Sequence, residues 1–190
     1  MLNRLSLFMC RNYSPCLLLA LFVPVIGLFL LFNFSNSPIP ISNPQLVSIS
    51  GGEGLLDLKF FYTAQEAYAS LTKYGEAGRS LYKNFLAADF IFALCYGIGF
   101  SLLFTRLLKA LDQSESGWMK FNLLPLAIAL ADYTENILIY SMLHVYPQPV
   151  PVLGTLAGIA TLGKQLLVFA SLAFLLAGTI VLIMRKIKAR

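Results

Sequence analysis

Apolar residues along this chain gather in four long runs, separated by shorter polar segments. The runs cover residues 15–34, 85–105, 122–143 and 165–184. Each is close to the roughly 20 residues that a helix needs to cross the hydrocarbon core of a bilayer. The pattern therefore predicts four transmembrane helices in a single integral membrane domain that covers residues 1–190.

A segment of different character, residues 35–84, separates the first two runs. Its first part, as far as Gly54, is rich in Ser, Pro, Asn and Gly and indicates an irregular loop. Thr63 and Glu66 have the spacing of a capping box, so a helix should begin there. Several tyrosines in the same segment favour a position at the membrane–water interface: Tyr62, Tyr68, Tyr74 and Tyr82. We therefore expect an all-α, four-helix transmembrane bundle with an additional amphipathic interfacial helix in this first outer loop.

Prolines and length decide the remaining boundaries. Pro147, Pro149 and Pro151 end the third run, because serial prolines cannot continue a helix. Residues 152–163 are apolar but too short to span, so they either lie at the interface or lengthen the fourth helix. The first run exceeds the roughly 7–15 residues of a signal-peptide core, so we expect a retained first span.

Composition supports the membrane class and narrows the chemistry. The chain is 58% hydrophobic and only 12% charged, whereas a soluble domain carries about 25% charged residues. The three cysteines lie in separate segments without a CxxC motif, so no disulfide framework or redox site is expected. His144 is the only histidine, which excludes zinc and haem sites built on paired histidines. No metal site and no cofactor are identified.

The basic residues set the expected orientation. The net charge is +5, and Lys and Arg gather at the chain ends and in short loops, which suits topology and anionic lipid better than nucleic acid. With the amino terminus inside, the inner side holds Arg4, Arg11, Arg106, Lys109, Lys120, Arg185, Lys186, Lys188 and Arg190. The outer side holds Lys59, Lys73, Arg79, Lys83 and Lys164. Both termini are therefore expected in the cytoplasm, in a plasma or inner membrane rather than an organelle.

The third run carries polar side chains near its middle. Asp132, Glu135 and Asn136 are spaced i, i+3 and i+4, so they share one sector of a helix. An acidic side chain at the bilayer centre costs about 2.5–3.5 kcal/mol even on lenient insertion scales. These residues should therefore point together into protein or into a wet cavity. Tyr140 continues the same face outward.

A matching polar face is predicted on the second run. Gly75, Tyr82, Asp89 and Tyr96 recur every seven residues, and Arg79 belongs to the same face. Asp89 should lie about 6 Å below the outer end of that span. We expect it within about 8 Å of the Glu135 and Asn136 side chains, close enough to couple directly or through one water.

The fourth run completes the predicted site. Lys164 stands at its outer end, at the level where Asp89 enters. Small residues permit close contact between helices: Gly97, Gly99, Ser171 and Gly178. The candidate binding residues are Arg79, Tyr82, Asp89, Tyr96, Asp132, Glu135, Asn136, Tyr140 and Lys164.

These groups allow several kinds of chemistry. The carboxyl groups of Asp89, Asp132 and Glu135 are candidate general acids and bases, and oxygen ligands of this kind also suit a hard cation. Arg79 and Lys164 are able to hold a phosphate or carboxylate headgroup. In the structural alternative, the acids and the amide only join helices, at roughly 0.6 kcal/mol for each hydrogen bond. Arg79 and Lys164 would then snorkel to lipid phosphate, which is the simpler interpretation for Lys164.

The sequence leaves three functions open. The first is binding or conversion of a small amphiphile or lipid in an acidic cavity in the outer half of the membrane, which leaves open whether the protein is an enzyme. The second is a non-enzymatic structural or assembly subunit whose polar face meets another membrane protein. The third is transport coupled to protons or cations. The number of buried ionisable groups favours a functional site over packing alone. The expected partners are the bilayer and a small amphiphilic ligand, and no nucleic acid.

One motif pattern resembles that of known proteins. The pattern is Tyr74-Gly75-x-x-Gly78-Arg79-x-x-Tyr82, then Asp89, then Ala131-Asp132-x-x-Glu135-Asn136. It is similar to the pattern of small uncharacterised four-span membrane proteins and covers residues 55–140. That resemblance implies a multi-pass protein and no particular activity. The plan of four spans with intramembrane acids is also similar in architecture to the sterol-isomerase-like four-helix proteins of the endoplasmic reticulum, and no catalytic residue carries over.

Overall fold

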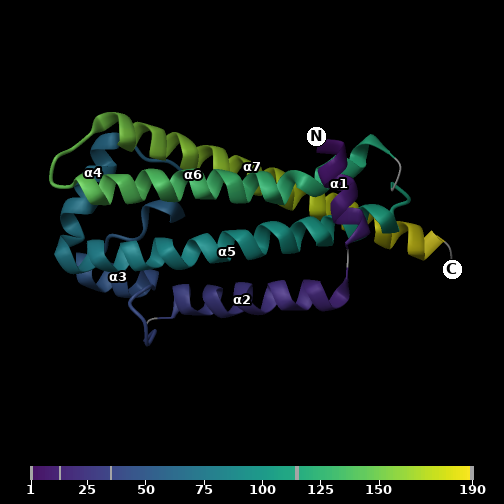
Figure 1. The fold of residues 1–190 in the computed structure, drawn as a ribbon, viewed down its shortest axis with the longest axis horizontal. Helices are drawn as coiled ribbons and strands as arrows, with labels where there is room; N and C mark the ends of the chain where they lie inside the picture. The colour runs from purple at the N-terminus through teal and green to yellow at the C-terminus, as the bar shows by residue number, and fades with distance from the viewer. Residues whose placement is uncertain (1, 13, 35, 114–115, 189–190) are drawn as a thin grey trace.

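The long helices lie side by side along the longest axis of the molecule (Figure 1). The structure is a computed structural model, and it describes residues 2–12, 14–34, 36–113 and 116–188. Within those ranges, four stretches are long and apolar enough to cross a membrane: α2 (Pro15–Asn33), α5 (Gly75–Ala110), η2 (Gly117–Leu123) with α6 (Leu124–Val145), and α7 (Pro151–Lys188). The predicted all-helical class and the four candidate spans are therefore confirmed. Ser35, where the outer loop was predicted to begin, and Arg190 of the basic end lie outside the described residues.

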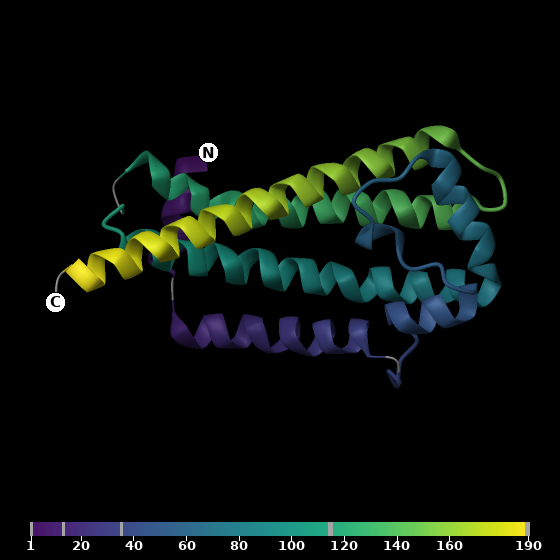
Figure 2. The same ribbon diagram turned by 180° about the vertical axis from the view of Figure 1, so that it is seen from behind.

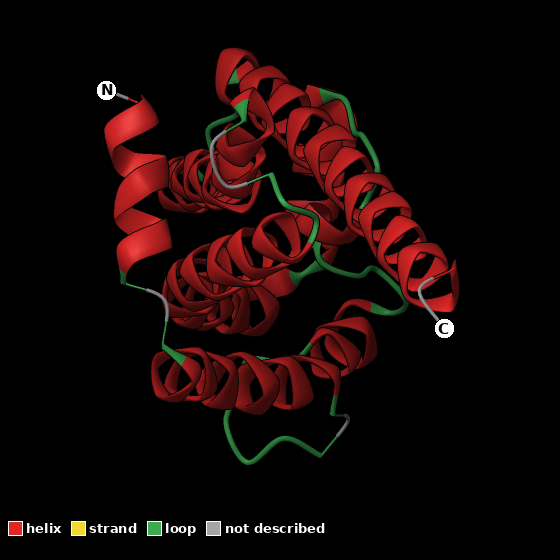
Figure 3. Cartoon of the chain, turned by 90° about the vertical axis from the view of Figure 1, so that its right-hand side faces the viewer, coloured by secondary structure: helices red, strands yellow, loops and turns green. Residues whose placement is uncertain are grey.

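The helices pack around α5, which contacts α2 on one side and α6 on the other (Figures 1 and 2). α7 packs along α6. Both ends of the described chain lie at the same end of the bundle, where α1 (Leu2–Arg11) crosses the long helices (Figure 1). Seen along the bundle, the described chain contains helices and connecting loops, with no strand (Figure 3).

Two of the helices are longer than the apolar runs predicted. α5 begins at Gly75, whose φ of +61° is a left-handed conformation that separates it from α4 (Ala64–Lys73). α7 begins at Pro151, where proline suits the first helical turn because no backbone donor is needed there. Residues 152–163 therefore lengthen the fourth helix. Counting about 1.5 Å per residue, Asp89 and Lys164 lie roughly 20 Å from the starts of their helices. Their expected position near the outer end of the spans stays a prediction.

The segment between α2 and α5 contains more helix than its composition indicated. α3 (Asn43–Ser50) begins at a capping box in which Ser42 and Gln45 exchange hydrogen bonds. It is followed by the short 3₁₀ helix η1 (Leu56–Leu58). α4 begins with the predicted capping box between Thr63 and Glu66. The irregular loop predicted before residue 55 is thus partly helical, because a local cap offsets its poor helix composition.

The tyrosines of this loop correct another expectation. Tyr62, Tyr74 and Tyr82 are each at most 1% exposed and belong to the main hydrophobic core. These three tyrosines therefore pack in the core and are not exposed as an interfacial belt would be, because the loop folds back over the end of the bundle and covers them. Tyr68 remains accessible, and its hydroxyl accepts from the backbone N–H of Val150.

Small residues set the closest approaches between elements. A Cβ atom on Gly97 would lie 2.7 Å from Cβ of Ala129, which explains how α5 and α6 come together. A Cβ on Gly158 would lie 2.0 Å from the carbonyl oxygen of Tyr62, so the loop before α4 rests directly on the backbone of α7. This contact holds the loop before α4 against α7.

Candidate functional site

A cavity of about 380 Å³ lies among α2, α5, α6, α7 and η1. Pockets that hold small ligands have volumes of roughly 300–1,000 Å³. The lining residues of α5 extend from Phe85 to Phe104, a length of about 28 Å along the helix axis, so the cavity is elongated. Its shape suits a linear molecule better than a compact one.

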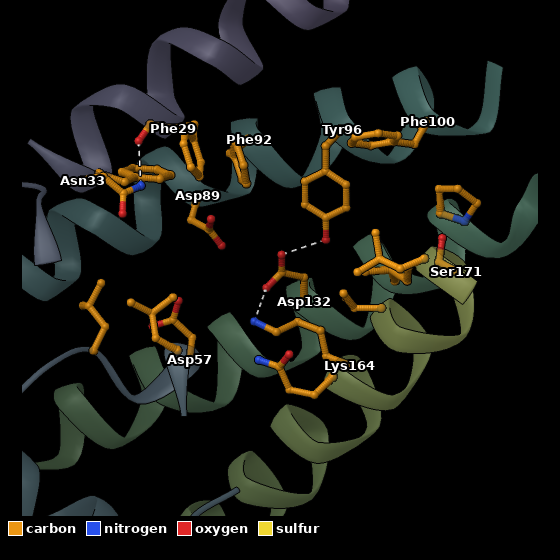
Figure 4. Close-up of a pocket in the computed structure, with 18 of the residues that line it drawn as sticks. Phe29, Asn33, Asp57, Asp89, Phe92, Tyr96, Phe100, Asp132, Lys164 and Ser171 are labelled. Carbon is orange, nitrogen blue, oxygen red and sulfur yellow. Dashed lines mark hydrogen bonds and ion pairs between the residues drawn. The ribbon is translucent and has the colours of Figure 1, made fainter. Parts of the chain in front are cut away.

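The two ends of the cavity differ in polarity. Asp57 and Asp89 lie toward one end, and Asp132, Lys164 and the Tyr96 hydroxyl group lie near the middle (Figure 4). Toward the other end the lining is almost entirely apolar: Phe100, Phe104, Pro125, Ile128, Val168, Leu172 and Leu175. The cavity is therefore amphipathic along its length.

The rim of the cavity faces outward from the bundle. Phe29 of α2 and Leu172 of α7 both line the cavity, and each is 56% exposed. Exposed apolar side chains on membrane-spanning helices lie where lipid chains would contact them. Exposed apolar side chains of α2 and α7 therefore border the cavity.

Lys164 is the centre of a buried charge cluster. Its Nζ donates to Oδ1 of Asp132 at 3.0 Å and forms an ion pair with Oε2 of Glu135. The hydroxyl groups of Tyr96 and Thr161 donate to Asp132 and Glu135, respectively. Lys164 is only 8% exposed, so the interpretation that it snorkels to lipid phosphate was wrong. Two carboxylates on α6 provide a charge partner inside the bundle that lipid would otherwise have to supply.

Asp89 joins α5 to α6 through a neutral partner. The Asn136 side-chain amide donates to Oδ2 of Asp89 at 2.6 Å. This confirms the predicted proximity of the two residues, whereas Glu135 turns toward α7 instead. No hydrogen bond to Oδ1 of Asp89 occurs in the described part of the chain, and its carboxylate points into the cavity (Figure 4).

Asp57 closes the polar end from the loop side. The Tyr82 hydroxyl donates to Oδ1 of Asp57 at 2.8 Å and accepts from the backbone N–H groups of Leu56 and Asp57. These bonds fix η1 to the buried face of α5. Tyr82 does not line the cavity, and it acts by positioning a residue that does.

Two predicted site residues lie elsewhere. Arg79 donates to the backbone oxygen of Leu71 at 3.1 Å, and its guanidinium carbon lies 4.2 Å from the ring centroid of Tyr146. Tyr140 is 47% exposed and does not line the cavity. Both were assigned by helical periodicity, which places a residue on a face but does not show which element covers that face.

Glu135 and Asn136 support the site without lining it. Each is fully buried and holds a lining residue in place, Lys164 for Glu135 and Asp89 for Asn136. Asp132, Glu135 and Asn136 all point into protein, as their shared sector predicted, but they divide between two neighbouring helices.

Sequence reasoning missed Asp57 and Thr161. Asp57 lies between two leucines in a segment without periodicity, so its position gives no signal before the loop is folded. Thr161 precedes Lys164 by three residues and therefore shares its helix face, a spacing that could have identified it. The aromatic lining of α2 was missed because that run is apolar on every side.

The loop that carries Asp57 is fastened by its own ion pairs. Glu53 accepts from Nζ of Lys59 at 2.6 Å and from Nζ of Lys73 at 3.0 Å, and the Ser70 hydroxyl group also donates to it. The hydrogen bond from Lys59 is the main cause that lowers the pKa of Glu53 to about 2. The loop is therefore pinned to α4 at any ordinary pH.

Comparison with known proteins leaves the site to be interpreted from its own geometry. Among the described residues, no group of three or more His, Cys, Asp or Glu side chains is arranged to hold a metal ion. The resemblance to small four-span membrane proteins rests on the motif pattern alone. No family model, curated protein or solved structure matches this chain.

Proposed function

We propose that this membrane protein binds a small single-chain amphiphile or lipid, with the polar head at the acidic end of the cavity and the tail along its apolar end. The observation that carries the proposal is the amphipathic cavity itself, which places Asp57 and Asp89 at one end, and Asp132 and Lys164 near the middle, of an otherwise apolar space. Ligand pockets typically combine a mainly apolar lining with a few convergent polar groups.

The bilayer is the proposed source of the ligand. The exposed rim at Phe29 and Leu172 would let a chain enter sideways from the lipid, so no path from water is needed. A structural subunit would need its polar side chains only to hold helices together. The uncommitted oxygen of Asp89 and the open cavity beside it favour a ligand over that role.

The orientation and the outer loop form part of the proposal. Both termini would lie in the cytoplasm, which is supported by the excess of Lys and Arg at their end of the bundle. The polar end of the cavity, nearer to η1, would then lie in the outer half of the membrane. α4 would rest at the outer interface as the amphipathic helix of the first outer loop.

The experiment is mass spectrometry of what co-purifies with the protein in mild detergent. We expect wild-type protein to retain one amphiphile per chain. Ser171, on the cavity wall, is replaced in one variant by Ser171→Phe, and exposed Ala173 on the same helix provides the control, Ala173→Phe. The first should lose the ligand and the second should keep it. If wild-type protein retains nothing, or if Ser171→Phe retains as much as wild type, the structural-subunit function becomes the better account.

A further inference from the structure

The charges around the cavity do not balance. Lys164 is the only basic residue among the described residues that line it, and Asp132 and Glu135 already share that charge. Asp57 and Asp89 have only neutral partners, the hydroxyl group of Tyr82 and the amide of Asn136. The polar end therefore offers two acidic groups that form no ion pair with a basic side chain of the described residues.

Of these two acidic groups, Asp89 gives the stronger indication of a bound ligand. Only 5% of its surface is exposed, and one of its carboxylate oxygens makes no hydrogen bond within the described chain. Burying a carboxylate without a full set of partners is costly. A ligand that brings positive charge and N–H donors to that oxygen would offset the cost.

Aromatic rings surround the same position. Phe32 packs against Phe85 and Phe92 with centroid separations of 4.5 and 5.5 Å, and Phe92 packs against Tyr96 at 5.4 Å. All four rings line the same cavity as Asp89, and Figure 4 shows the ring of Phe92 beside it. Cations are attracted to the faces of aromatic rings within about 6 Å. An uncommitted carboxylate among aromatic rings is a combination that suits an organic ammonium group.

We infer that the amphiphile bound in this cavity carries an ammonium head, seated beside Asp89 and among the rings of Phe32, Phe85 and Phe92. This inference rests on the proposed function and adds the chemical class of the ligand. The charge would lie near Asp57 and Asp89, and the alkyl chain would extend past Tyr96 toward Phe104. An anionic head would meet the acidic groups at close range, because Lys164 is already engaged.

The experiment compares three head groups on one chain. Dodecylammonium, dodecanol and dodecanoate are titrated into wild-type protein in phosphatidylcholine nanodiscs at neutral pH, and the heat taken up by empty nanodiscs is subtracted. We expect dodecylammonium to bind at least about tenfold more tightly than either of the others, the effect of one added charge interaction.

A pair of variants locates the preference. Asp89→Asn keeps the shape of the side chain and should lower the affinity for dodecylammonium about fivefold or more, with little change for dodecanol. Glu76 is exposed at the start of α5, and Glu76→Gln is the matched control that should bind as wild type does. The wild-type comparison of head groups needs no variant to fold.

The possible outcomes separate the two proposals. Equal or tighter binding of dodecanol or dodecanoate overturns the ammonium inference and leaves the proposed function standing. An ammonium preference that survives unchanged in Asp89→Asn also overturns the placement of the head. If none of the three amphiphiles binds above the empty-nanodisc level, the proposed function itself fails, and the inference fails with it.

Discussion

Lys164 decides the electrostatics of the bundle interior. It is the single cation that the described cavity lining provides, and it contacts both Asp132 and Glu135. A buried ion pair contributes little net stability compared with apolar residues, but removing one partner leaves the other charge uncompensated. The structure therefore depends on Lys164 more than on any exposed basic residue of the same helix.

Replacing Lys164 by methionine tests this dependence. Lys164→Met should lower the free energy of unfolding by about 3–5 kcal/mol, because Asp132 and Glu135 lose their only cation. Thermal unfolding in detergent measures the effect. The exposed Lys188 near the end of α7 provides the control, and Lys188→Met should change stability by less than about 0.5 kcal/mol. Adding Glu135→Gln to Lys164→Met should recover part of the loss. Equal melting temperatures for Lys164→Met and wild type would contradict this role.

Side-chain partners were harder to predict than side-chain burial. Helical spacing placed Asp132, Glu135 and Asn136 inside the protein, and the structure agrees. It could not show that Lys164 is their neighbour, because that depends on where α7 begins. Because α7 begins at Pro151, Lys164 lies about 20 Å from the start of the helix, and there its side chain reaches the acids on α6.

At the scale of elements, the backbone of α7 lies very close to the loop before α4. Gly158→Ala would place a methyl group against the carbonyl oxygen of Tyr62. Overpacking of this kind typically costs about 1–3 kcal/mol. Gly163 on the same helix has no atom within 4 Å of an added Cβ. Gly163→Ala should therefore be neutral or stabilising by up to about 1 kcal/mol, because alanine favours helix. Similar melting temperatures for the two variants would contradict the close contact.

The ion pairs of Glu53 give the loop a defined pH response. The lowered pKa of Glu53 means that its contribution is fully present above about pH 4.5 and is lost as the pH falls toward about 2. Glu53→Gln should cost roughly 1–3 kcal/mol at neutral pH and flatten the stability profile over that acidic window. Thermal unfolding across pH measures this, and amide exchange of residues 55–62 should quicken in the variant. A wild-type profile that is already flat would show that the pairs contribute nothing.

Local signals predicted some elements of the loop and missed others. The capping box at Thr63 correctly located α4, because that motif acts through bonds among adjacent residues. α3 has an equally clear box at Ser42, but the surrounding Ser, Pro and Gly residues indicated a loop and concealed it. The burial of Tyr62 and Tyr74 depends on contacts with distant helices, which no local pattern contains.

At the scale of the whole molecule, the orientation in the membrane can be tested by cysteine labelling. In a cysteine-free background, Asn36→Cys lies at an exposed position in the loop after α2, and Lys188→Cys lies near the carboxyl terminus. A membrane-impermeant maleimide applied to intact cells should label the first and not the second, because the basic termini favour the cytoplasm. Labelling of Lys188→Cys alone would show that the termini lie outside the cell and would contradict the expected orientation.

Apolar runs were sufficient to predict the class and the four candidate spans, because a helix that crosses lipid must satisfy its backbone internally and be apolar outside. For the cavity, the sequence predicted only that polar faces of several helices come together. Its apolar half, its exposed border on α2 and α7, and the contribution of Asp57 depend on how α2 and the loop after it pack. Those contacts involve residues far apart in the chain, and the sequence carries no periodic signal for them.

The most direct test of the central claim locates the tail of a bound amphiphile. Two dodecyl probes with a diazirine at the end of the chain, one with an ammonium head and one with a hydroxyl head, are photolysed with the protein in nanodiscs, and the adducts are mapped by peptide mass spectrometry. We predict adducts at the apolar end of the cavity, on Phe100, Phe104 or Leu175, that disappear when the matching unlabelled amphiphile is present in excess. Adducts confined to outward-facing residues such as Ile91 and Leu94, unchanged by the competitor, would contradict binding within the cavity.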